Sequence, residues 1–154
     1  MVSTCAATPT YTVTATVVNT LRADQVGTLP EYVRAHQQRI PSGGDRQWVQ
    51  LFGPVGARLT SVAVDGKPVV WGTNLRAKAN TNQKATGVAD RRPAVRGTMY
   101  GRPVGTVSVT LGPASEKTVT AVFTGSPKDS RSVEVSHTPK VRAVPVEITE
   151  ATCR

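Results

Sequence analysis

Two cysteines at opposite ends of the sequence are the first residues that could do chemistry. Cys5 and Cys153 are the only cysteines among the 154 residues. A disulfide between them would close nearly the whole chain into one loop, which would stabilise the fold by about 4–5 kcal/mol through loop entropy. Because disulfides persist outside the cytosol, the pair predicts an extracytoplasmic protein. Two free thiols are the alternative, and two distant cysteines without a nearby histidine do not form a four-ligand zinc site.

Basic residues concentrated between Thr73 and Arg102 are the second candidate. The seven basic residues are Arg76, Lys78, Lys84, Arg91, Arg92, Arg96 and Arg102, and the single acidic residue among them is Asp90. Such a segment could bind the phosphates of a wall polymer, of lipid head groups or of nucleic acid. The alternative, which fits charge runs in general, is a solvated loop that only aids solubility. Tyr100 is the one aromatic residue in this stretch, whereas stacking platforms for nucleic acid use several.

Catalytic and metal-binding motifs do not stand out from the sequence. The two histidines, His36 and His137, have no second histidine or carboxylate at ligand spacing. A triad could be drawn with Asp45 or Asp129 and a serine, but no Gly-x-Ser-x-Gly motif supports it. We therefore predict a protein that is not an enzyme, with no catalytic residue, no cofactor, no metal site and no small-molecule substrate.

Length and charge bound the class of protein. A chain of 154 residues fits one domain with its own core. The net charge of +9 favours polyanionic partners. No apolar run approaches the roughly 18 residues of a membrane helix, and the start Met1-Val2-Ser3-Thr4 lacks the apolar region of a signal peptide. If the protein is exported, we expect the targeting segment to lie upstream.

Strict alternation of apolar and polar residues predicts the elements that must position these side chains. The expected strands are Thr10–Thr20, Arg46–Phe52, Leu59–Val64, Lys67–Trp71, Pro103–Leu111, Glu116–Thr124, Arg131–Ser136 and Val144–Thr149. Asp65-Gly66 suits a two-residue hairpin turn. We expect a loop over Asn19–Gly27, a helical turn over Leu29–Arg34 and a long basic loop or insertion over Gly72–Gly97.

This pattern predicts an all-β fold: an antiparallel immunoglobulin-like β-sandwich of about seven to nine strands, with one short helical turn, in a single domain over residues 1–154. The aromatic residues on strands, Tyr11, Trp48, Phe52, Trp71 and Phe123, are expected mostly in the core. An exposed pair lining a carbohydrate or partner surface is the alternative.

Several short motifs resemble those of one protein family. They are Tyr11-Thr12-Val13-Thr14 leading to Asn19-Thr20, Leu29-Pro30-Glu31-Tyr32-Val33, Val64-Asp65-Gly66-Lys67-Pro68-Val69, Gly101-Arg102-Pro103-Val104, Val109-Thr110-Leu111-Gly112-Pro113 and Ser136-His137-Thr138-Pro139. Together they are similar to the C-terminal β-domain of an actinobacterial family of membrane-anchored extracytoplasmic proteins, a domain of unknown function. In that family the Asp-Gly hairpin leads more directly to Gly-Arg-Pro-Val, so the intervening stretch is expanded in this chain.

The resemblance implies export, an upstream membrane helix and a larger N-terminal region, and it implies no activity. The main expectation is therefore a non-enzymatic, extracytoplasmic structural or interaction module of a cell-envelope-anchored protein. Its partner would be another protein or the upstream region of the same protein. The alternative is a binder of anionic polymer (cell-wall polymer, anionic lipid or nucleic acid) through the basic loop.

Overall fold

The computed structural model describes residues 2–3, 8–34, 40–69, 95–125, 135–138 and 143–149. The strands in these ranges are β1 (Val2–Ser3), β2 (Thr10–Asn19), β3 (Asp45–Phe52), β4 (Arg58–Val64), β5 (Lys67–Pro68), β6 (Val95–Met99), β7 (Arg102–Leu111) and β8 (Ser115–Thr124). A short 3-10 helix, η1 (Ala23–Thr28), follows β2.

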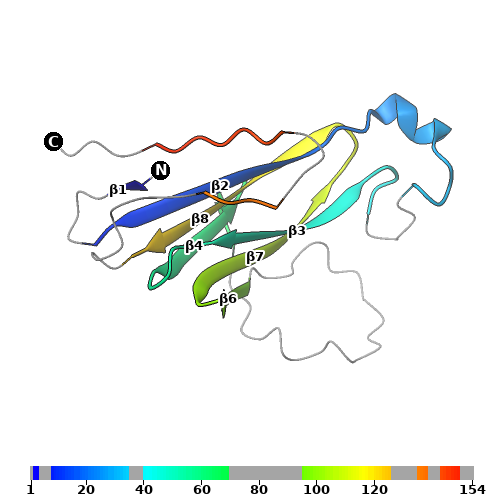
Figure 1. Ribbon diagram of the computed structural model, residues 1–154. Helices are drawn as coiled ribbons and strands as arrows, with labels where there is room; N and C mark the ends of the chain where they lie inside the picture. The colour runs from blue at the N-terminus through cyan, green and yellow to red at the C-terminus, as the bar shows by residue number, and fades with distance from the viewer. Residues whose placement is uncertain are drawn as a thin grey trace, which may run out of the picture.

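The strands form two antiparallel sheets that pack in a sandwich-like arrangement (Figure 1). The larger sheet has the strand order β1-β2-β8-β4-β5, and the smaller sheet has the order β3-β7-β6. β8 pairs along its full length with β2, from Thr10 opposite Thr124 to Asn19 opposite Ser115. The prediction of an all-β antiparallel fold is confirmed.

Alternation along the strands explains how the larger sheet forms its core face. On β8 the side chains of Val119, Ala121 and Phe123 are fully buried, and Thr120 and Val122 between them are only partly buried on the outer face. β-Branched residues favour this pleated packing. On the outer face two cross-strand threonine pairs join β2 to β8, with Oγ1–Oγ1 distances of 3.3 Å for Thr14–Thr120 and for Thr16–Thr118.

Two glycines allow the sheets to approach closely around Phe123. A Cβ atom on Gly53, which follows β3, would lie 2.4 Å from the ring of Phe123. A Cβ on Gly105 of β7 would lie 2.9 Å from Val62 of β4. Real Cβ contacts are essentially never so short, so a close-packed interior has no room for a side chain at either position. Glycine within a strand often marks such an approach of another segment.

Turns form where the sequence supplies residues that tolerate positive φ. Asp65 and Gly66 have φ values of 49° and 74°, as a two-residue type I′ hairpin requires. The predicted hairpin between β4 and β5 is therefore confirmed. The predicted turn at Leu29–Arg34 is present, because the N–H groups of Val33 and Arg34 both donate to the carbonyl of Pro30.

Three expectations differ from the structure. Asn19–Gly27 is not only loop, because η1 begins at Ala23. The expected basic loop Gly72–Gly97 ends too late, because β6 begins at Val95. Val144–Thr149 lies in the described range 143–149, where it forms no strand. Its neighbour, Arg131–Ser136, lies largely outside the described residues.

The aromatic residues divide between core and surface. Tyr11 and Phe123 are buried as expected, and Phe52 is half-buried. Trp48 is 50% exposed, so the expectation that it lies in the core is wrong. The reason is alternation on β3, where Val49 and Leu51 take the inward positions. Trp71 lies outside the described residues.

We expect Gly53→Ala to destabilise the fold by about 1–3 kcal/mol, because the added methyl group overpacks the core against Phe123. Gly97→Ala is the matched control, since the nearest atom to its Cβ would be 3.9 Å away. Urea unfolding of both variants measures the difference. Equal stabilities of the two variants would contradict the close sheet packing.

Candidate anion-binding site

The sequence-predicted site residues fall mostly outside the described part of the chain. Cys5 and Cys153 lie there, so the disulfide stays a prediction. The same holds for five of the basic residues, namely Arg76, Lys78, Lys84, Arg91 and Arg92. The two described basic candidates are Arg96 on β6 and Arg102 at the start of β7. They are separated on the β6–β7 hairpin, because Arg96 is opposite Gly105 and Arg102 is opposite Met99.

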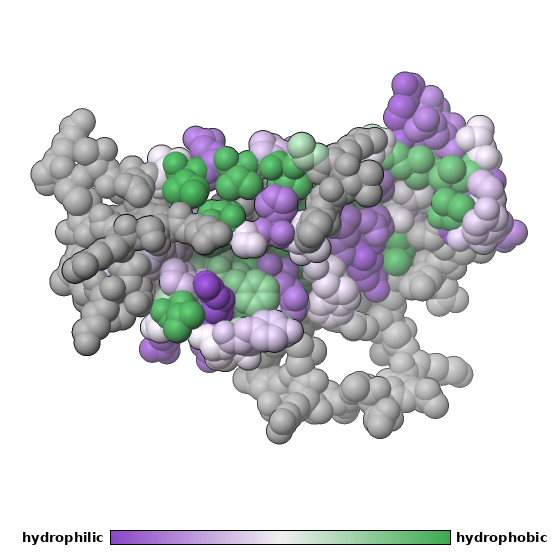
Figure 2. Space-filling view, viewed as in Figure 1, coloured by the Kyte–Doolittle hydropathy of each residue, from purple (hydrophilic) through white to green (hydrophobic). Residues whose placement is uncertain are grey.

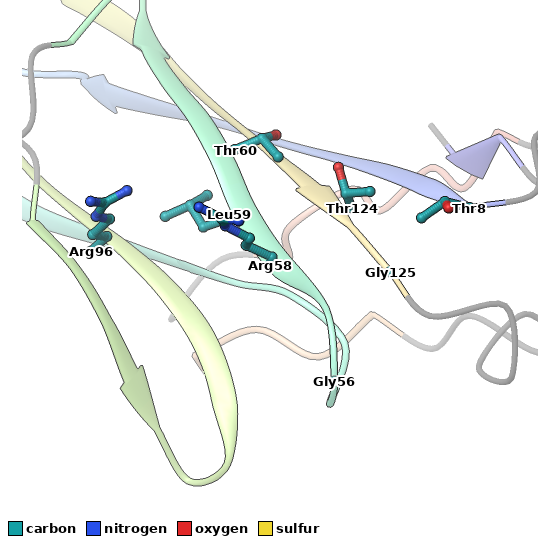
Figure 3. A pocket seen from close by; sticks show the side chains of 8 residues that line it. All are labelled: Thr8, Gly56, Arg58, Leu59, Thr60, Arg96, Thr124 and Gly125. Atoms are coloured by element: carbon teal, nitrogen blue, oxygen red, sulfur yellow. The ribbon is translucent and has the colours of Figure 1, made fainter.

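A surface hollow of about 480 Å³ brings Arg96 together with a second arginine, Arg58 of β4 (Figure 3). The lining residues come from the larger sheet, the smaller sheet and the adjoining loops, and they are Thr8, Gly56, Arg58, Leu59, Thr60, Arg96, Thr124 and Gly125. Arg102 is not among them. The hollow therefore collects residues that lie far apart in sequence.

The pairing of β6 with β7 determines where Arg96 points. Arg96 is directly opposite Gly105, and opposite residues in an antiparallel pair share one face of the sheet. Gly105 is buried and faces Leu59 and Val62 of the larger sheet. Arg96 therefore projects from the inner face of the smaller sheet, at its edge strand, toward the beginning of β4.

A β-bulge shapes the opposite side of the hollow. The register of β4 against β8 shifts between Leu59 and Ser61, which leaves Thr60 as the extra residue. The Thr60 hydroxyl donates to the carbonyl of Val122 at 2.9 Å. Bulges commonly redirect side chains at the edges of functional sites. Here the bulged residue, Thr60, is two residues after Arg58 and lines the same hollow (Figure 3).

Two glycines, Gly56 and Gly125, line the hollow. Gly56 has a φ of 81°, which favours glycine in the turn before β4. Gly125 follows β8, and a Cβ there would lie 2.5 Å from the ring of Tyr11. The N–H of Gly125 donates to the carbonyl of Pro9 at 2.8 Å, which fixes the end of β8 beside Thr8.

The chemistry of the lining favours an anionic ligand. Two guanidinium groups line the hollow, and none of the eight lining residues is acidic. Guanidinium groups form strong, often bidentate, hydrogen bonds to phosphate and carboxylate. The hydroxyls of Thr8 and Thr124 can add donors, whereas the Thr60 hydroxyl already donates to the backbone.

Other chemistry is sparse in the described part of the chain. No group of three or more His, Cys, Asp or Glu residues there could hold a metal ion. His137 is exposed, and its Nδ1 lies 3.0 Å from the carbonyl oxygen of Thr138. No helix in the described ranges is long and apolar enough to cross a membrane.

Arg58 was missed by sequence reasoning because it lies outside any run of charge. Its role depends on the two sheets facing each other, which no local pattern encodes. The available signal was Gly105 within an otherwise alternating strand, because such a glycine indicates close approach of another segment.

Comparisons of the chain with protein-family models, with curated proteins and with solved structures found no match. The resemblance to the actinobacterial family therefore stays a prediction.

We expect sodium sulfate to shift the backbone amide resonances of Gly56, Thr60 and Gly125 in a saturable NMR titration. Arg96→Gln should weaken the affinity by about ten-fold or more, because a hydrogen bond to a charged group is lost. Arg102→Gln is the matched control on the same hairpin, and it should leave the affinity unchanged. Equal losses in the two variants would show that the hollow is not the site.

Proposed function

We propose that this chain is a non-enzymatic interaction module that binds an anionic polymer at the hollow between Arg58 and Arg96. The observation that carries the proposal is the convergence of these two arginines, from β4 and β6, on a hollow whose eight described lining residues include no acidic one. The ligand class that fits best is a polymer of phosphate groups, because phosphate accepts paired hydrogen bonds from guanidinium.

The charge of the whole chain supports a polymer over a small ligand. The net charge is +9, and much of the excess lies in the segment that leads into β6. A polymer that occupies the hollow could extend along this segment, where each further phosphate adds electrostatic attraction. Binding of this kind needs no catalytic group.

The proposed location outside the cytosol and the proposed membrane-anchored parent protein are supported by the sequence. A Cys5–Cys153 disulfide would place the module outside the cytosol. The resemblance to membrane-anchored actinobacterial proteins supports presentation at the cell envelope through an upstream segment. An immunoglobulin-like strand order is also part of the proposal, supported by the sandwich-like packing of two antiparallel sheets.

Affinity for inorganic polyphosphate and for duplex DNA, measured across a salt series, tests the function. We expect the Arg58→Gln/Arg96→Gln double variant to bind at least about ten-fold more weakly, through lost charge-assisted hydrogen bonds. On duplex DNA the slope of log affinity against log salt should fall in magnitude by about two, since about 0.9 counterions are released for each neutralised phosphate. Stronger binding of polyphosphate or of DNA by the wild type would show which of these two kinds of polymer the hollow prefers.

Two controls make the result specific. A Lys67→Gln/Arg102→Gln variant removes the same charge from exposed positions outside the hollow, and it should keep most of the affinity. A variant with glutamine at Arg76, Lys78, Lys84, Arg91 and Arg92 tests the basic segment without altering β6. If only this third variant loses binding, the segment and not the hollow is the site. If the wild type binds neither polymer, the proposed function is wrong.

A further inference from the structure

The outer edge of β2 is incompletely paired among the described strands. β1 pairs only with Thr10 and Tyr11, and no other described strand pairs with β2 on this side. The part of β2 from Val13 to Asn19 carries no charged residue, no proline and no bulge. Natural proteins usually protect a long edge with such features, because an open edge recruits other strands. We therefore expect another strand to pair with this edge.

Backbone hydrogen bonds on the two sides of β8 determine which backbone groups of β2 face the open edge. Gly125 donates to the carbonyl of Pro9, so odd-numbered residues of β2 turn their backbone groups toward β8. On the other side of β8, the carbonyl of Thr118 accepts from the N–H of Asp65 after β4. Because backbone groups alternate along a strand, those of Thr14, Thr16 and Val18 point toward the edge.

Residues 143–149 have the length, the direction and the sequence pattern of a strand that fits this edge. The seven residues alternate, with Val144, Val146 and Ile148 separated by Pro145 and Glu147. In Figure 1 the segment is extended but forms no strand, and in this view it runs in the opposite chain direction to β2. Its three aliphatic side chains are 43%, 49% and 47% exposed, and a row of apolar side chains is visible over it in Figure 2.

We propose that the edge of β2 is a strand-binding site and that its occupant is the segment 143–149 of the same chain, as an antiparallel strand. Pro145 has no N–H, so its backbone must face away from β2. The backbone groups of Val144, Val146 and Ile148 then face β2 and pair with those of Val18, Thr16 and Thr14, respectively.

This arrangement explains two further features. Directly opposite residues share a face, so the three aliphatic side chains lie on the outer face beside Val18, which is itself 49% exposed. The new edge of the sheet then carries Pro145 and Glu147, and a proline and a charge are the devices that discourage pairing with other chains.

The predicted disulfide is compatible with this pairing. Cys5 precedes Thr10 by five residues, and Cys153 follows Thr149 by four residues. In an antiparallel pair with β2, the segment runs from the Asn19 end toward the Thr10 end. Both cysteines would then approach the same end of β2, where the bond could hold the strand in place.

Amide hydrogen exchange of the full chain, followed by NMR, tests the proposal. We expect the amides of Val144, Val146 and Ile148 to exchange at least about ten-fold more slowly than those of Glu147 and Thr149, as one net hydrogen bond each would give. Uniformly fast exchange over 144–149, or slow exchange at Glu147 and Thr149 instead, would overturn it. Slow exchange that is lost on dilution, together with a dimer by size, would show pairing between copies and overturn pairing within one chain.

A pair of proline variants makes the test specific. Val146→Pro removes an N–H that faces β2, so Val144, Ile148 and Thr16 should lose their slow exchange. Glu147→Pro removes an N–H that faces away, and these three amides should stay protected. The amides of Val119 and Ala121 on β8 report whether the sheet itself stays folded in both variants. Equal effects of the two prolines on Val144 and Ile148 would contradict the proposed pairing.

Discussion

The pairing of β8 with β2 on one side and with β4 on the other is the interaction on which the rest of the structure depends. It places Val119, Ala121 and Phe123 at the centre of the core, where they are almost completely buried. Burying a large apolar side chain contributes roughly 1.5–3 kcal/mol, so this strand supplies much of the stabilisation. Its register also fixes β2 and β4, and through them both the hollow and the open edge.

Close packing of the two sheets connects the core to the candidate site. Gly105 allows β7 to approach Leu59 and Val62, and the same register directs its opposite residue, Arg96, toward β4. The bulge at Thr60 then places Arg58 and Thr60 at the same hollow. A cationic site thus arises from the geometry of the sheets and does not need a contiguous basic motif. The proposed binding surface is therefore centred on the two sheets and not on the basic segment.

The sequence predicts the local elements well because alternation and turn chemistry are local. The strands around Val13, Val62, Val109 and Ala121 follow from a period of two, and the hairpin at Asp65 follows from residues that tolerate positive φ.

Three features could not be predicted in this way. The inward position of Arg96 depends on its cross-strand partner, which the sequence does not specify. The exposure of Trp48 depends on which face of β3 meets the other sheet. Whether residues 143–149 pair with the edge of β2 depends on backbone contacts between segments far apart in sequence, which alternation alone cannot decide.

Chemical footprinting of arginines tests directly whether the polymer binds at the hollow between Arg58 and Arg96. Phenylglyoxal modification, read by mass spectrometry with and without bound polyphosphate, measures the accessibility of each guanidinium group. The account predicts that polyphosphate protects Arg58 and Arg96 while Arg102 and Arg22 react as in the free protein. Equal modification of Arg58 and Arg96 with and without bound polymer would contradict the proposal that the hollow is the binding site.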